Sequence, residues 1–449
     1  MKTDAQGIQL TTASDAAVAG YDAAVDALAG FKADPSVHAK TALEADPDFA
    51  MGHALRGYFY LMLGVPAVHA KAKASLARAE QGVATPREHA HFLGLQAWCD
   101  GDLITAVGRW EKLLIDHPGD LMALNLTTSF YFHSGDALNL RDTVARVLPA
   151  WSEDMPGYGY VLGKYAFGLE ECGDYGRAED CARRAVAING EDIWAVHAAA
   201  HVMEMRGRTA DGIAWLAETE AGWTRCALLV HRLSWHNALS PPARHPRAPP
   251  PPLYDPTVPA RLSQIIYDMH DAASLLWRLE LAGVDVGARW DELADISKAR
   301  IGDHNDAFTD AHFTMCLAGA GRVGAVRDMI DSMRSYAASK PATMAEIMRD
   351  VGIDASLGLA AYRAGDHALA VDSLLPIRYR IHRIGGSHAQ RDLFAQTLIE
   401  AALRCGRFAL ARALTAERSA VMPGNAPAAR LRARALEGLV HRWIKPPRR

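Results

Sequence analysis

Apolar and small residues recur along almost the whole chain at helical spacing, in pairs of segments joined by a short turn. Residues 157–189 form the clearest pair, in which Ala178, Ala182 and Ala185 place small side chains on one face of the second segment. Small residues at this spacing allow two helices to approach closely. The alternating pattern typical of strands is nearly absent, so the sequence predicts an all-α fold.

A turn that contains Gly separates the two segments of each pair and recurs every 34 to 44 residues, apart from one interval of two periods. The turn glycines are Gly64, Gly101, Gly135, Gly173, Gly207, Gly283, Gly321, Gly365 and Gly406. A repeat of this length is typical of helical arrays, in which neighbouring units bury a continuous core. We therefore expect a right-handed α-solenoid of tetratricopeptide-like helix-turn-helix repeats.

The pattern predicts four segments. Residues 1–45 form an N-terminal helical cap, residues 46–239 form repeats, residues 240–256 interrupt them, and residues 257–449 form further repeats and a C-terminal cap. Seven prolines fall within residues 240–252, where the period requires a turn and a helix. Because proline prevents helix formation, two explanations stay open: a Pro-rich surface loop, or a local reading-frame change in the gene.

Composition and charge narrow the classes of partner. Half of the 449 residues are hydrophobic, and the net charge of −4 comes from interspersed acids and bases. Nucleic-acid binding requires a basic face, so we expect no nucleic-acid partner. No apolar run reaches the length of about 18 residues that a membrane span needs. Six dispersed cysteines without a CxxC pair, and a polar N-terminus without an apolar signal core, predict reduced thiols and a cytoplasmic location.

Three residues of the segment 192–205 are the main candidates for chemistry. His197, His201 and Glu204 follow one another at spacings of four and three residues, so they share one face of a helix. Two imidazoles and a carboxylate can bind a divalent metal such as zinc, and they can also serve as an acid–base pair with an orienting carboxylate. A polar stripe that only stabilises the fold is the third alternative, and all three stay open.

Further candidates lie on other helical segments. His236 lies where it could face the same cavity as the first cluster, whereas His231, five residues earlier, points about 140° away from it. His312 lies in the middle of a predicted helix, where a pocket role and a structural role are both open. Tyr158 and Tyr160 crowd one helix start, where they could form a wall of a ligand site.

The string from Ser387 to Arg391 has the features of an anion site. Ser387 and Gln390 have the spacing of a capping box at a helix start, and two glycines precede them. Backbone N–H groups at such a start can bind an anion. Arg391 could add a bidentate contact to a carboxylate or phosphate, with His388 beside it. A purely structural cap is the alternative.

Five longer strings form a specific set, at residues 155–160, 195–205, 235–236, 271–279 and 385–392. Together they resemble the bacterial relatives of tetratricopeptide repeat protein 38, and the likeness covers most of the chain. The resemblance implies an α-solenoid of degenerate tetratricopeptide-like repeats, and it implies no settled biochemical activity. The Pro-rich interruption departs from the family pattern.

Two functions from different classes fit these patterns. The first is a scaffold that binds a peptide or a small polar or anionic ligand in a concave pocket lined by His, Asp and Glu, because recognition is the usual task of repeat arrays. The second is a metal-assisted or His acid–base hydrolase or lyase, with His201, Glu204, His236 and His312 as catalytic residues. The enzyme requires these groups to converge with Arg391 in one enclosed pocket, whereas a scaffold spreads them along a groove. A homodimer is compatible with either function.

Overall fold

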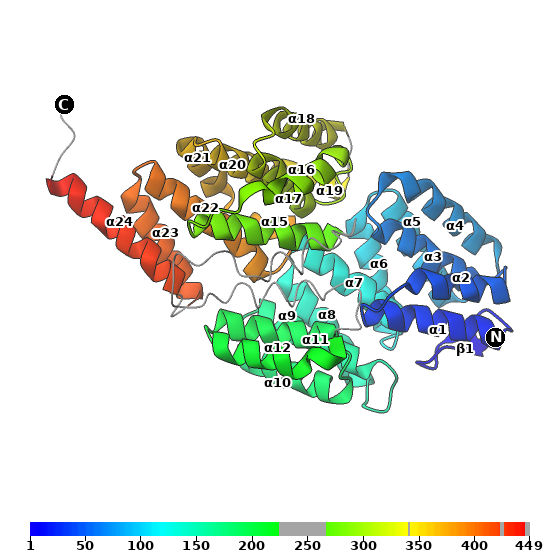
Figure 1. The fold of residues 1–449 in the computed structure, drawn as a ribbon. Helices are drawn as coiled ribbons and strands as arrows, with labels where there is room; N and C mark the ends of the chain where they lie inside the picture. The colour runs from blue at the N-terminus through cyan, green and yellow to red at the C-terminus, as the bar shows by residue number, and fades with distance from the viewer. Residues whose placement is uncertain (224–265, 340–341, 423–425, 445–449) are drawn as a thin grey trace. The chain divides into compact units, whose positions relative to one another are not determined.

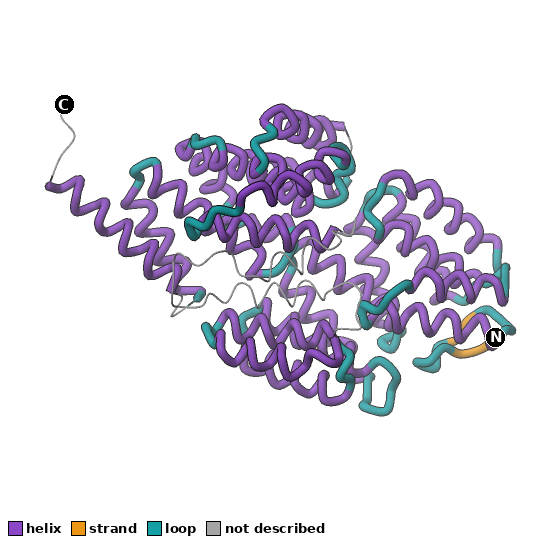
Figure 2. Tube along the Cα trace, viewed as in Figure 1, coloured by secondary structure: helices purple, strands orange, loops and turns teal. Residues whose placement is uncertain are grey.

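Helices make up nearly all of the computed structural model (Figures 1 and 2). It describes residues 1–223, 266–339, 342–422 and 426–444. The Pro-rich segment and the candidate residues His231 and His236 lie outside the described residues. Within them, the strands are β1 (Lys2–Thr3) and β2 (Gln9–Leu10), which pair antiparallel near the N-terminus.

The described helices follow one another as antiparallel pairs, and they cluster into two compact units. The first boundary along the chain falls inside α11, and residues 216–223 and 342–344 belong again to the first unit. Before this boundary lie α1 (Asp15–Ala29), α2 (Pro35–Ala45), α3 (Ala50–Met62), α4 (His69–Gln81), α5 (Pro86–Cys99), α6 (Leu103–Asp116), α7 (Leu121–Ser134), α8 (Ala137–Val147), α9 (Tyr158–Glu171) and α10 (Tyr175–Ile188). The next pair is α11 (Ile193–Met205) and α12 (Thr209–Trp223).

The second unit continues with the same arrangement of helices. Its later helices are α15 (Ile266–Leu281), α16 (Trp290–Ala299), α17 (Ala307–Gly319), α18 (Val323–Ser339), α19 (Thr343–Ile347), α20 (Ile353–Arg363), α21 (His367–Ile377), α22 (His388–Arg404), α23 (Phe408–Val421) and α24 (Ala426–Ile444). A π-helical turn at Met348–Gly352 joins α19 to α20. Short 3₁₀ turns lie at Pro66–Val68, Leu148–Ala150, Gly287–Arg289 and Ile381–Ile384.

The recurring glycine ends the first helix of each pair. All nine turn glycines have a positive φ, between +61° and +85°, which a residue with a side chain rarely adopts. At Gly101, the N–H of the following Asp102 donates to Ala97 O at 3.0 Å, which satisfies a carbonyl at the helix end. The Asp102 side chain then accepts from Thr105 N and begins the next helix. The predicted all-α helical-repeat solenoid class is therefore confirmed, with helix-turn-helix units of the tetratricopeptide type.

The two helices of a pair differ in burial. In α10 the buried residues are Ala178, Ala182 and Ala185, so one face packs on α9 and the other faces solvent. In α9 every residue except Tyr165 is buried, and α17 is buried along its whole length. The first helices therefore carry their polar side chains into the core, where those groups need partners.

A buried ion-pair network shows how such partners are supplied in the first unit. Asp120 begins α7, and its Oδ1 accepts from Ala123 N at 2.8 Å. Its Oδ2 accepts from Arg87 Nε at 2.6 Å and contacts His91 Nε2 at 3.0 Å, both on α5. Although burial disfavours the carboxylate, the Arg87 guanidinium and His91 hold the pKa of Asp120 well below its usual range.

The same guanidinium anchors the N-terminal segment. Arg87 Nη2 donates to the Tyr21 hydroxyl at 3.3 Å and lies 3.7 Å from Asp4 Oδ2. Burial raises the pKa of Asp4 to about 6, although Arg87 opposes the rise. One arginine thus connects α1, α5, α7 and the residues before α1.

We predict that Asp120→Ala destabilises the first unit far more than the loss of an ordinary helix cap does. Removing one partner of a buried ion pair costs about 3–5 kcal/mol, and here it leaves the buried Arg87 charge with only the more distant Asp4 carboxylate. The matched control is Asp102→Ala, which removes an exposed cap worth about 0.5–2 kcal/mol. Urea unfolding followed by circular dichroism measures both, and equal losses would contradict the role given to Asp120.

Candidate functional site

Two acidic residues and one histidine meet inside the first unit. Glu170 and Glu171 are the last residues of α9, and His201 lies on α11. One donor atom from each of the three side chains lies within 4.8 Å of the other two, and all three residues are buried. His201 Nδ1 is 3.7 Å from Glu170 Oε2. The helices α9 and α11, which are the first helices of neighbouring repeats, therefore bring together three side chains that can bind a cation or transfer a proton.

Aromatic rings enclose one side of this group. The His197 and His201 rings are 4.3 Å apart between centroids, and His197 stacks on Phe167 at 5.7 Å. Trp194 packs against both Phe167 and His197. Glu204, the third residue of the predicted metal set, is half-buried and does not belong to the group that Glu170 and Glu171 form with the histidine. Metal binding by His197, His201 and Glu204, which their helical spacing predicts, stays a prediction.

A second polar site lies on the same helices, nearer their starts. Asp192 begins α11, and its Oδ1 accepts from Trp194 N and Ala195 N, each at 3.1 Å. Its Oδ2 is buried and has no hydrogen-bond partner among the described residues. A Cβ added at Gly163 would lie 2.6 Å from that oxygen, so α9 approaches the carboxylate closely at the residue before Lys164.

Burial shifts the pKa values of both charged groups at this site, Lys164 and Asp192. It lowers the pKa of Lys164 to about 8, although the nearby Asp192 opposes the change. It raises the pKa of Asp192 to about 7, against the two backbone N–H groups and Lys164. Both pKa values therefore lie near neutral pH, as is common at functional sites.

The repeat register relates this site to the closed network described above. Asp120 and Asp192 each precede their turn glycine by fifteen residues, and His91 and Gly163 each precede theirs by ten. In the network around Asp120, Arg87 and His91 contact the second carboxylate oxygen. At Asp192 the residue that corresponds to His91 is Gly163, which has no side chain to offer. The site at Asp192 is thus an open version of the same arrangement.

Asn125 lies at the corresponding position of α7, ten residues before its turn glycine. It is 5% exposed, and neither its Oδ1 nor its Nδ2 has a hydrogen-bond partner among the described residues. A buried amide without partners costs free energy and calls for an explanation. Asn125 on α7 and Asp192 at the start of α11 therefore both carry buried polar atoms without a hydrogen-bond partner among the described residues.

The second unit contains its own histidine cluster. His270 Nε2 on α15 lies 3.0 Å from Thr309 Oγ1 on α17. The His312 ring packs on Phe308 at 4.1 Å and lies 4.9 Å from the His270 ring. His312 Nδ1 contacts the Phe308 carbonyl at 2.8 Å. Asp306 starts α17 and accepts from Thr309 N at 2.6 Å, so this cluster combines helix capping with ring packing.

The predicted capping box at the start of α22 is present. Ser387 Oγ accepts from Gln390 N at 3.3 Å, and Gln390 Oε1 accepts from Ser387 N at 2.9 Å. The Arg391 guanidinium donates to the Gly386 carbonyl and lies 3.5 Å from His388 Nδ1. Arg391 is thus folded back onto its own loop, and anion binding at this helix start stays a prediction.

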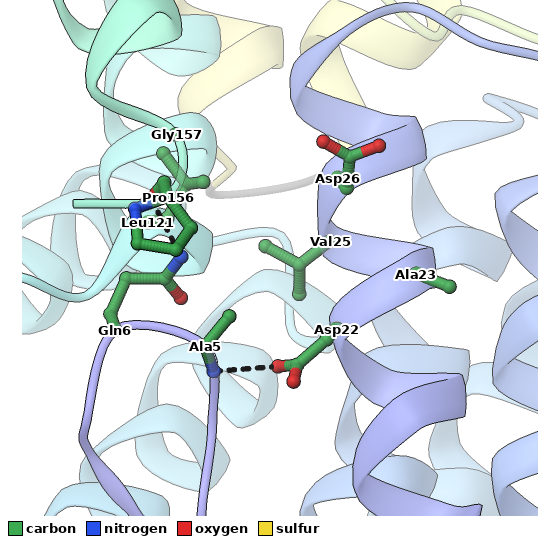
Figure 3. Close-up of a pocket in the computed structure, with 9 residues that line it drawn as sticks. All are labelled: Ala5, Gln6, Asp22, Ala23, Val25, Asp26, Leu121, Pro156 and Gly157. Atoms are coloured by element: carbon green, nitrogen blue, oxygen red, sulfur yellow. Dashed lines mark hydrogen bonds between the residues drawn. The ribbon is translucent and has the colours of Figure 1, made fainter. Parts of the chain in front are cut away.

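A surface pocket of about 290 Å³ opens in the first unit, between α1 and the start of α9 (Figure 3). Asp22 and Asp26 of α1 face Gln6, Pro156 and Gly157 across it. Asp22 Oδ1 accepts from Ala5 N at 3.1 Å. Asp26 is already paired with Lys32 Nζ at 2.9 Å, so the acidic wall of the pocket is partly neutralised.

The predicted ligand-binding tyrosines lie beside this pocket. Tyr158 follows directly after Gly157, and Tyr160 donates its hydroxyl to Asp26 Oδ1 at 3.1 Å. Both tyrosine side chains are buried. They support the pocket wall, and a direct contact of either with a ligand stays a prediction.

The site residues predicted from sequence do not include Glu170, Glu171, Lys164 or Asp192. One signal for the glutamates was available: acidic residues in the last turn of a helix oppose its dipole. The expected convergence of His201, His236, His312 and Arg391 involves both units and a residue outside the described part, so it stays a prediction.

These repeats define the class of protein as an all-α helical-repeat protein. No family model matches the chain. Among solved structures, the chain is similar to a monomeric mutant of IFIT1 with Gppp-AAAA, at 15% identity and a TM-score of 0.36, covering 86% of this chain and 90% of that one. A further IFIT1 mutant with m7Gppp-AAAA gives a TM-score of 0.35 at the same identity and coverage.

The expectation that nucleic acid is excluded as a partner is wrong. The two similar IFIT1 structures are with Gppp-AAAA and m7Gppp-AAAA, which are capped oligonucleotides. At this identity and TM-score the likeness assigns no ligand to the present chain.

In the described part of the chain, no helix is both long and apolar enough to span a membrane.

We predict that Lys164 becomes nucleophilic at a lower pH than an ordinary lysine. Because only the neutral amine reacts and burial lowers its pKa from 10.5 to about 8, the reactivity of Lys164 should rise steeply around pH 8. Competitive labelling with acetic anhydride, read by peptide mass spectrometry, measures this, with exposed Lys40 as the internal reference. Asp192→Asn should move the midpoint still lower, and a wild-type midpoint near 10.5 would contradict the buried environment.

Proposed function

We propose that the protein is a helical-repeat binding protein that holds a small polar or anionic ligand, or a peptide, against the first helices of its first unit. The observation that carries this proposal is the set of buried, incompletely paired polar atoms on Asn125 and Asp192, together with the buried amine of Lys164. Of the predicted His/Asp/Glu lining this site keeps only an aspartate, Asp192, and it has Asn125 and Lys164 in place of the predicted histidines.

A buried polar group without a hydrogen bond destabilises a fold by about 1–3 kcal/mol. A chain that retains such groups at Asn125 and Asp192 loses stability that it could recover with apolar residues. Binding proteins accept this loss because the same groups pair with a ligand.

The chemistry of the three residues defines the ligand class. The Asn125 amide offers one donor and one acceptor side, and the Lys164 ammonium suits a carboxylate or another anion. Asp192 Oδ2 accepts hydrogen bonds when ionised and donates one when protonated, and its pKa of about 7 makes both states accessible. A ligand with an anionic group and an amide or hydroxyl group matches this set.

An enzyme is the second candidate, and the contact between His201 and Glu170 favours it. A buried imidazole 3.7 Å from a carboxylate can serve as a general base in a hydrolase or lyase. Chromogenic ester, phosphate and amide substrates test this candidate with wild type and His201→Gln. Turnover that falls in the variant supports catalysis, and equal turnover removes His201 from it.

Four further predictions from the sequence stay predictions, and the proposed function does not depend on them. They are the relation to the bacterial relatives of tetratricopeptide repeat protein 38, the four-segment division, a cytoplasmic location and a homodimer. The specific strings that carry the family resemblance include residues 195–205, which contain most of α11.

We predict that Asn125→Leu stabilises the protein. Leucine has a similar branched shape and removes both unpaired polar atoms, so the free energy of unfolding should rise by about 1 kcal/mol. Urea unfolding followed by circular dichroism measures the change without a known ligand. If Asn125 served the fold instead, the substitution would lower stability by a comparable amount, and the proposal would lose its main support.

The matched control is Thr128→Val on the same helix. The Thr128 hydroxyl is buried and donates to Leu124 O at 2.7 Å, so its hydrogen bond is already satisfied. This substitution should lower the free energy of unfolding by about 0.5–1.5 kcal/mol. Opposite signs for the two variants separate a group kept for binding from a group kept for folding.

A further inference from the structure

We propose that Glu170, Glu171 and His201 bind one divalent cation at the end of α9. This site is separate from the proposed ligand site, which uses Asn125, Lys164 and Asp192 nearer the helix starts. It also differs from the set predicted from helical spacing, because two of its three ligands come from the neighbouring repeat.

The geometry is close to that of a bound ion. Ligand atoms about 2.0–2.2 Å from one ion lie about 3–4.4 Å apart from one another. The donor atoms of Glu170, Glu171 and His201 lie within 4.8 Å of one another, so small rotations of the two flexible glutamate side chains would complete the coordination. The three residues are buried at 0%, 6% and 1% exposure, which keeps competing water away.

The position in the fold favours positive charge. Glu170 and Glu171 close α9, and the partial negative charge at a helix C-terminus adds to that of the two carboxylates. The α9 helix has no basic residue in its last turn. A divalent cation bound there would interact favourably with both carboxylates and with the helix end.

The donor set selects among the common metals. Two carboxylates and one imidazole leave coordination positions for water or a substrate, as catalytic zinc sites do. Imidazole and carboxylate ligands suit zinc and manganese, and the general affinity order places zinc above manganese. We therefore expect Zn²⁺ to bind more tightly than Mn²⁺.

The test uses the full-length, tag-free chain after dialysis against EDTA. Isothermal titration with ZnCl₂ should give one ion per chain, and mass spectrometry of the metal content should agree. Glu170→Gln, Glu171→Gln and His201→Gln should each weaken binding at least about tenfold, because each removes a direct ligand. Circular dichroism spectra and melting temperatures establish that each variant is folded.

Glu204→Gln is the matched control. Glu204 precedes Gly207 by three residues, as Glu170 precedes Gly173, and it belongs to the ligand set predicted from sequence. The affinity for zinc should stay within about twofold of wild type in this variant. The visible absorption spectrum of the Co²⁺ complex gives a second readout, which should be lost in His201→Gln and kept in Glu204→Gln.

Two results would overturn the proposal. One is the absence of stoichiometric zinc binding by the wild-type chain. The other is zinc binding that survives Glu170→Gln and Glu171→Gln, or that Glu204→Gln weakens as much as they do. Neither result bears on the proposed ligand site at Asn125 and Asp192. That site is tested separately, by whether Asn125→Leu raises or lowers the free energy of unfolding.

Discussion

The left-handed glycine turn is the constraint on which the rest of the structure depends. Its positive φ ends one helix and lets the chain reverse within a few residues, so the second helix packs back on the first. Alanines on the second helix, such as Ala178 and Ala182, then allow close contact. Because the pairs stack, the first helix of a pair is covered from several sides, and α9 and α17 are buried almost entirely.

Because the first helices are buried, each of their polar side chains needs a hydrogen-bond or ionic partner. An aspartate at the helix start is paired in one repeat and left open in another. Asp120 is closed by Arg87 and His91, and the result is a network that joins four segments. Asp192 faces Gly163 and Lys164 instead, and its second oxygen has no partner among the described residues. The same cap therefore stabilises one repeat and provides a candidate binding group in another.

The two proposed sites divide α9 between them. Near its middle, Lys164 faces the open carboxylate, and at its end Glu170 and Glu171 meet His201. Both sites use contacts between first helices of successive repeats, which is where a repeat array can combine side chains that are far apart in a single helix. Neither site depends on a loop, so the helices hold their groups rigidly.

The sequence by itself determined the local structure. The glycine period, the alanine spacing and the capping box at Ser387 predict the helices and their ends, because these signals act within a few residues. Only the tertiary structure decided that His201 meets Glu170 rather than pairing with Glu204 alone. The spacing of residues along one helix follows from helix geometry, whereas contacts between repeats depend on how the first helices stack, which packing of the whole core determines.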